Sequence, residues 1–191
     1  PGFYKEAPLE RPITEQRALL LTDDAGIQLG YKTQKFAQEP YNSFSVLRAH
    51  FDAWFAKKVD AAGGMVIPKT VVSDVIKEGN KITGIKTDQG ETLFADCVLA
   101  CDGVNSLLAQ KAGLHKEWEP SDAALAVKEV LTLPREKIED RFNLEGNEGC
   151  AIEFMGTISK GMVGIGFLYT NKDSLSLGIG CLLSDYQQSL I

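Results

Sequence analysis

Hydrophobic and polar residues recur along this chain with two different spacings, which together predict a mixed α and β protein. Residues 44–62 carry aromatic and aliphatic side chains at helical spacing, and two glycines follow them. This segment is therefore predicted to be a helix with one apolar face, ended by the glycines. Asn42, Ser43 or Ser45 is expected to cap its first turn, because their side-chain oxygens accept hydrogen bonds from free backbone N–H groups.

Short strand-like segments lie on both sides of this helix. Residues 17–22 and 26–33 flank the turn sequence Asp-Asp-Ala-Gly and predict a β-hairpin. Residues 69–76, 81–87 and 91–94 are separated by two glycine-containing turns, which is typical of an antiparallel meander. The first half of the chain thus combines a hairpin, a helix and a small sheet.

An acid–glycine pair follows a continuous apolar run. Residues 97–101 do not alternate, so they predict a strand that is buried on both faces. Asp102 and Gly103 come directly after it, and a helix is predicted over residues 104–112. Open α/β sheets bind ligands at the carboxyl ends of their strands, and glycine allows a close approach to the backbone. By itself, the same pattern equally predicts a tight strand-to-helix turn.

The last third of the chain predicts a second, antiparallel sheet. Residues 123–133 have strand character, and Pro134 suits the first turn of a short helix over residues 135–141. Three further strands are predicted, and in the last one Leu, Ile and Cys alternate with Ser and Gly. The face of small residues allows another group to lie close to that strand. These three strands cover residues 150–155, 162–169 and 174–183.

Composition excludes several function classes. The net charge is −6 and the pI is near 5.0, which argues against a nucleic-acid-binding surface. The four cysteines and two histidines match no metal-ligand spacing, so no metal site is predicted. No apolar run is long enough to span a bilayer, and no signal peptide opens the chain. Because the first residue is Pro1, we expect the chain to be an internal piece of a longer protein.

Three short sequence segments resemble those of a known family. They are Ala-Val-Lys-Glu-Val at 126–130, Ile-Glu-Asp-Arg-Phe-Asn at 138–143 and Gly-Phe-Leu-Tyr-Thr-Asn-Lys-Asp-Ser at 166–174. Together with Arg48 at the predicted helix and the Asp-Gly pair, they resemble the FixC family of electron transfer flavoprotein–quinone oxidoreductase-like proteins. The resemblance covers residues 41–183, about three quarters of the chain.

The resemblance implies a set of FAD-binding residues. It places Arg48 beside the FAD pyrophosphate, the backbone of Val72 at the adenine end, and Asp102 with Gly103 beside the flavin crevice. A guanidinium suits a diphosphate because it offers several donors at once. The alternatives are that Arg48 only pairs with Asp52 one helical turn later, and that Asp102 mainly holds the turn. Neither the family resemblance nor the residue pattern identifies a catalytic residue.

The family pattern also implies how the chain is divided. Residues 1–40 are expected to be an N-terminal hairpin of the substrate-side sheet, residues 41–113 the middle of the FAD-binding domain, and residues 114–191 the substrate-side antiparallel sheet. The predicted fold class is therefore α+β or α/β, with part of a Rossmann-like domain. No Gly-x-Gly-x-x-Gly sequence occurs, so the βαβ unit that cradles the diphosphate is expected to precede Pro1.

The implied function is that of an FAD-dependent oxidoreductase. It would pass electrons from electron transfer flavoprotein toward quinone, with a ferredoxin-like partner, and would be cytoplasmic or peripheral at the inner membrane face. The piece alone is expected to lack FAD and to be inactive. Two alternatives remain, a geranylgeranyl-reductase-type flavoenzyme and a non-enzymatic interaction module. Lys128 and Glu129, which are adjacent on a predicted strand, are expected to face opposite sides of the sheet, so that only one of them can face a substrate cavity.

Overall fold

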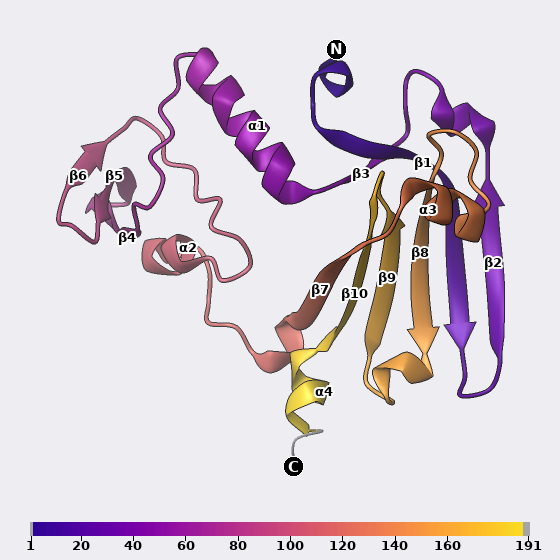
Figure 1. Ribbon diagram of the computed structural model, residues 1–191. Coiled ribbons are helices and arrows are strands. Elements are labelled where there is room, and N and C mark those ends of the chain that lie inside the picture. The colour runs from indigo at the N-terminus through magenta and orange to yellow at the C-terminus, as the bar shows by residue number, and fades with distance from the viewer. Residues whose placement is uncertain (1, 189–191) are drawn as a thin grey trace. The chain divides into compact units, whose positions relative to one another are not determined.

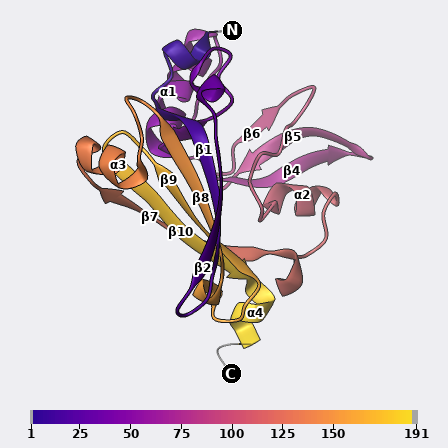
Figure 2. The ribbon, with the colours of Figure 1, turned by 90° about the vertical axis from the view of Figure 1, so that its right-hand side faces the viewer.

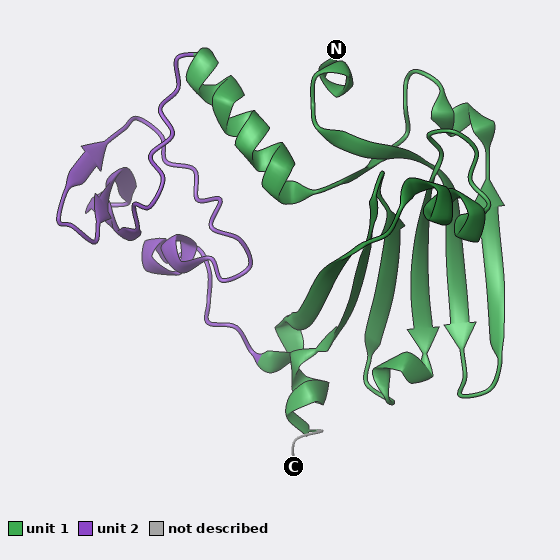
Figure 3. Ribbon diagram, in the orientation of Figure 1, with its two compact units in different colours: residues 1–62, 120–191 green, residues 63–119 purple. Residues whose placement is uncertain are grey.

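The computed structural model describes residues 2–188 and divides the chain into two compact units. Unit 1 comprises residues 1–62 and 120–191, and unit 2 comprises residues 63–119 (Figure 3). The units therefore divide after residues 62 and 119, whereas the sequence-based division lay after residues 40 and 113. The functional meaning of that earlier division stays a prediction. Each unit is described by itself below.

Unit 1 is built on a seven-stranded sheet, so the mixed α and β fold class is confirmed (Figure 1). The strand order is β2-β1-β8-β9-β10-β7, with β3 also paired to β1. All pairs are antiparallel except β1 with β8, which run parallel. The sheet is therefore mixed, whereas the sequence predicted an antiparallel one. The strands are β1 (Leu9–Leu21), β2 (Gly26–Lys32), β3 (Phe44–Val46), β7 (Ala124–Thr132), β8 (Gly149–Gly156), β9 (Gly164–Thr170) and β10 (Ser174–Leu182).

One face of this sheet, here called the core face, is partly covered by helix α3 (Arg135–Phe142) (Figures 1 and 2). Pro134 precedes that helix, as predicted from the sequence. Alternate residues of a strand share a face, so apolar side chains of β8 and β10 point toward α3. Ile138 of α3 packs against them and is fully buried. The buried cluster consists of Ile138, Leu144, Cys150, Ile152 and Leu175.

A buried arginine joins β1 to the loops at this end of the sheet. The guanidinium of Arg11 is fully buried and donates to the carbonyl oxygens of Asn171 at 2.7 Å and Glu148 at 3.0 Å. It also lies 3.2 Å from a carboxylate oxygen of Glu139 in α3. The predicted hairpin of β1 and β2 is confirmed, but β1 begins at Leu9 rather than at residue 17, because these contacts order its first half.

The predicted cap of the first helix is wrong. Helix α1 (Arg48–Ala61) follows Leu47, and no side chain caps it. Ser45 is instead drawn into the short strand β3, where its hydroxyl donates to the carbonyl oxygen of Thr170 at 2.8 Å and accepts from the Arg11 N–H at 3.1 Å. No residue of α1 is buried.

Unit 2 contains the predicted meander, which is confirmed. Strands β4 (Val72–Glu78), β5 (Lys81–Thr87) and β6 (Thr92–Phe94) pair in that order and are antiparallel. Gly79 and Gly90 have φ values of 61° and 85°, and such left-handed backbone in a turn favours glycine. Helix α2 (Leu107–Ala112) begins later than predicted and packs against β4.

The apolar run at residues 97–101 is not the doubly buried strand that its pattern predicted. Among the described residues it pairs with no strand, and Leu99 is 82 % exposed. Cys97 and Cys101 are exposed as well. A strand forms only where a neighbour accepts and donates its backbone hydrogen bonds, and the three-stranded sheet of unit 2 ends at β6.

The remaining elements are short. Helix α4 (Leu183–Gln188) follows β10, and its Asp185 accepts from the Val163 N–H at 2.7 Å, which joins α4 to the residue that precedes β9. The 3₁₀ helices span Phe3–Lys5, Gln34–Ala37, Pro120–Asp122 and Thr157–Ser159.

Candidate functional site

The first predicted cofactor residue, Arg48, lies at the first position of α1 in unit 1. Its side chain is 74 % exposed, and its Nε donates to Asp52 Oδ1 at 2.9 Å. This hydrogen bond also raises the pKa of Arg48. The structure therefore contains the i,i+4 pair that was the alternative interpretation. The two terminal nitrogens have no partner among the described residues, so an exposed fork remains for an anionic group.

Asp102 and Gly103 form a corner in unit 2. One carboxylate oxygen of Asp102 accepts from the Leu108 N–H at 2.8 Å, which satisfies a free donor of the first turn of α2. The Ser106 hydroxyl donates to the Gly103 carbonyl at 2.8 Å. Gly103 has φ 75°, and a Cβ there would meet no atom within 4 Å. The carboxylate thus holds the turn, and the backbone beside it is open to an approaching group.

Val72 is the first residue of β4 and pairs with Thr87 of β5. Only its backbone was predicted to contact a cofactor, so its residue type carries no further information. Val72, Asp102 and Gly103 belong to unit 2, whereas Arg48 belongs to unit 1. A single FAD site formed by all four residues therefore stays a prediction.

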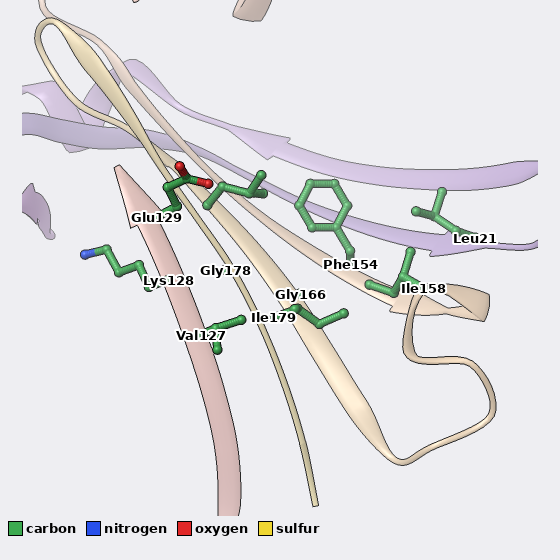
Figure 4. Close-up of a pocket in the computed structure, with 10 residues that line it drawn as sticks. Leu21, Val127, Lys128, Glu129, Phe154, Ile158, Gly166, Gly178 and Ile179 are labelled. Atoms are coloured by element: carbon green, nitrogen blue, oxygen red, sulfur yellow. The ribbon is translucent and has the colours of Figure 1, made fainter. Parts of the chain in front are cut away.

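A hollow on the core face of the sheet in unit 1 was not predicted from the sequence (Figure 4). It has a volume of about 540 Å³ and is bordered mainly by apolar side chains, including Phe154, Ile158 and Ile179. The strand register aligns Phe154 with Gly166, Gly166 with Ile179, and Ile179 with Val127. Gly166 keeps the floor low, because a Cβ there would lie 3.0 Å from Ile158 Cδ1. Gly166, which lies within a predicted strand, was the one feature of the sequence that could have indicated this hollow.

Lys128 and Glu129 lie on opposite faces of β7, as the strand pattern predicted. Glu129 pairs with Leu177 on the core face, and Lys128 pairs with Gly178 on the other face. Both residues border the hollow because β7 forms one side of it, but in Figure 4 the Lys128 side chain points away from Phe154 and Ile158. Glu129 is thus the ionisable side chain of β7 on the side of the hollow.

Two further properties of the described part of the chain bear on the chemistry. Residues 2–188 include no group of three or more His, Cys, Asp or Glu side chains placed to hold a metal ion. Within the same residues, no helix combines the length and apolar character needed to cross a bilayer.

The chain is similar to proteins named FixC over nearly its whole length. It is 48 % identical to Protein FixC of Azorhizobium caulinodans over 191 residues, which are 99 % of this chain and 44 % of that protein. It is 40 % identical to Protein FixC of Escherichia coli over 181 residues, which are 95 % of this chain and 42 % of that protein. The chain thus spans less than half the length of these curated relatives.

Solved structures show the same fold at low sequence identity. A geranylgeranyl bacteriochlorophyll reductase-like protein from Thermoplasma acidophilum matches 92 % of this chain and 42 % of its own, with a TM-score of 0.64 and 19 % identity. The flavin-dependent brominase Bmp2 matches 93 % of this chain and 41 % of its own, with a TM-score of 0.65 and 16 % identity. These likenesses concern the fold alone.

A family model supports the same grouping. The model described as tryptophan halogenase matches residues 14–142, which include most of β1 and all of unit 2 and α3. The FixC matches extend the similarity across β8, β9 and β10. The chain therefore belongs to the family that the tryptophan halogenase model describes, and within its matched length it is 40–48 % identical to proteins named FixC.

Proposed function

We propose that this chain is part of an FAD-dependent oxidoreductase that passes electrons from electron transfer flavoprotein toward a quinone. The observation that carries the proposal is the 48 % identity to FixC over 191 residues, since the FixC resemblance implies this activity. Fold neighbours described as a flavin-dependent brominase and as CtdE in complex with FAD support the cofactor class. Because the chain spans 44 % of such a relative, the activity belongs to a longer protein.

The residues fit the cofactor by their chemistry. Arg48 offers to a diphosphate two guanidinium nitrogens that have no partner within residues 2–188, and its hydrogen bond to Asp52 orients the side chain. Gly103 leaves the backbone accessible, while Asp102 keeps the corner in shape through Leu108. The β4 backbone at Val72 supplies an N–H and a C=O for the adenine end. When bound, FAD supplies the electron-transfer chemistry, and these residues hold and orient it.

The exposed apolar run gives the proposal its structural context. In the longer protein, residues 97–101 would gain strand neighbours and become the buried strand that their sequence predicts. Asp102 and Gly103 would then stand at the carboxyl end of a complete sheet, where ligands bind in open α/β folds. This chain alone would not retain FAD, since it lacks most of the contacts that such a sheet supplies.

The proposed partners follow from the same reasoning. They are electron transfer flavoprotein as donor, a ferredoxin-like protein as companion and quinone as acceptor. The site of action would be the cytoplasm or the inner face of the membrane, reached as a peripheral protein. No residue of this chain needs to donate a proton for electron transfer alone.

A second candidate is favoured by one feature, the apolar hollow. A geranylgeranyl-reductase-type enzyme reduces an isoprenoid, and a fold neighbour carries a related description. In that case Phe154, Ile158 and Ile179 would contact the substrate chain. Isoprenoid reduction by the longer protein, in place of electron exchange with electron transfer flavoprotein, would select this alternative.

The test uses the longer protein that contains this chain. Its purified form is expected to carry FAD, and Arg48→Met is expected to weaken FAD binding about tenfold, because it removes a charge-assisted contact to the diphosphate. The matched control is Arg135→Met, which removes an exposed arginine that also pairs at i,i+4. Absorbance gives the flavin content, and bleaching by reduced electron transfer flavoprotein tests the donor. Equal FAD content in both variants would overturn the role of Arg48.

A further inference from the structure

The second face of the large sheet, here called the open face, has side chains that differ from those of the core face. Register aligns Ala18, Glu153 and Phe167 across β1, β8 and β9 on this face. Near one edge, Leu29 and Tyr31 of β2 are 72 % and 59 % exposed. Helix α3 and the buried cluster lie on the core face, so these side chains gain no cover from them.

A second hollow lies on this open face and is distinct from the apolar one. It has a volume of about 490 Å³ and is formed by four neighbouring strands, β2, β1, β8 and β9. Small residues form its floor, because Ala18 and Ala151 have no side chain beyond Cβ. Two tyrosines and two polar side chains border it, namely Tyr31, Tyr169, Gln16 and Glu153.

The carboxylate of Glu153 is unpaired. Among residues 2–188, it meets no cation and no hydrogen-bond donor, whereas Glu15, Glu139 and Glu148 each form an ion pair. Among the described residues that border this hollow, Arg17 is the one cation, and it is bound to Glu15 at 2.7 Å and to the Phe142 carbonyl at 2.7 Å. Negative charge in the hollow is thus uncompensated.

The tyrosine beside this charge is held neutral. Burial raises the pKa of Tyr169, and the nearby negative charge of Glu153 raises the same pKa further. Phe167 stacks with Tyr169 at a ring-centroid distance of 5.2 Å, which fixes the position of the Tyr169 ring. An electron-rich ring and a free carboxylate therefore border the same small volume.

We propose that this hollow binds a small organic cation, a protonated or quaternary amine. Aromatic faces attract cations through their quadrupole, and the attraction grows when an opposite charge lies close. Glu153 would balance the charge of the ligand, while Tyr169 and Tyr31 would contact its carbon groups. An anion is disfavoured by the same carboxylate, and a purely apolar ligand would desolvate it without compensation. This inference does not depend on the proposed electron-transfer function.

Choline and its neutral isostere 3,3-dimethylbutan-1-ol test the proposal with this 191-residue chain. Saturable binding of choline, measured by calorimetry or by saturation-transfer NMR, is expected, together with binding of the neutral alcohol at least tenfold weaker. Glu153→Gln is expected to weaken choline binding about tenfold. Glu129→Gln, on the core face of the same sheet, is the matched control and should leave choline affinity unchanged.

Two tyrosine variants separate the ring from the hydroxyl. Tyr169→Phe keeps the aromatic face and should retain choline binding, whereas Tyr169→Leu should lose it. Circular dichroism would confirm that every variant is folded. The proposal is overturned if choline does not bind saturably, if the neutral alcohol binds equally well, or if Glu153→Gln binds choline as the unchanged chain does.

Discussion

The two units differ in how their apolar residues are used. All six buried hydrophobic residues found among residues 2–188 belong to unit 1, and Ile138 of α3 has no exposed surface. In unit 2, by contrast, Met65, Leu99 and Leu114 are 81 %, 82 % and 82 % exposed. Unit 1 is therefore stabilised by a core of its own, whereas unit 2 depends mainly on the backbone pairing of its meander.

The buried cluster of unit 1 is formed by residues of unit 1 alone. A sheet that carries its own covering helix can bury its core face without further chain. An apolar segment that lacks strand neighbours, such as residues 97–101, stays exposed although its sequence is typical of a buried strand. Similarity to proteins more than twice as long agrees with this interpretation.

Substitution of the buried arginine of unit 1 should destabilise the chain most. Arg11→Met should reduce the free energy of unfolding by about 3 kcal/mol or more, because it leaves buried carbonyl oxygens without donors. Arg48→Met removes only an exposed i,i+4 pair and should leave the free energy of unfolding nearly unchanged. Urea unfolding followed by circular dichroism measures both. A similar loss of unfolding free energy in the two variants would contradict a stabilising role for the buried hydrogen bonds of Arg11.

A second prediction compares the cores directly. Ile138→Ala should destabilise unit 1 by about 2–5 kcal/mol, since it leaves a cavity beneath α3. Leu99→Ala should change stability by less than about 0.5 kcal/mol, because the Leu99 side chain is already in solvent. Chemical denaturation of the 191-residue chain distinguishes the two. A large loss for Leu99→Ala would show that unit 2 has a core after all.

The smallest effect concerns thiol reactivity. Burial raises the pKa of the Cys150 thiol to about 11, whereas Cys97 and Cys101 are exposed. Iodoacetamide at pH 8 should therefore label the two exposed cysteines first and Cys150 last, as mass spectrometry would show. The folded state favours the protonated Cys150 thiol, so stability should fall as the pH rises from about 9 toward 11. Early labelling of Cys150 would contradict a closed core.

Much of the fold was predictable from local pattern. The hairpin, the meander, helix α3 and the three strands from residue 149 to residue 182 follow from alternation and turn residues. The Asp102 turn was predictable too, since a carboxylate before a helix commonly accepts from its first N–H groups. The similarity to FixC proteins was likewise apparent from three short sequence segments.

The order and kind of most elements were thus predictable from the amino-acid sequence, because they depend on neighbours within a few residues. The remaining features depend on contacts between segments that lie far apart along the chain. Ser45 joined β3 instead of capping α1, because its hydroxyl found the Thr170 carbonyl, which lies 125 residues further along the chain. Glu153 and Tyr169 met on one sheet face through strand pairing, which no local pattern encodes. Contacts between distant segments depend on the register and order of the strands, and those emerge only when the whole sheet forms.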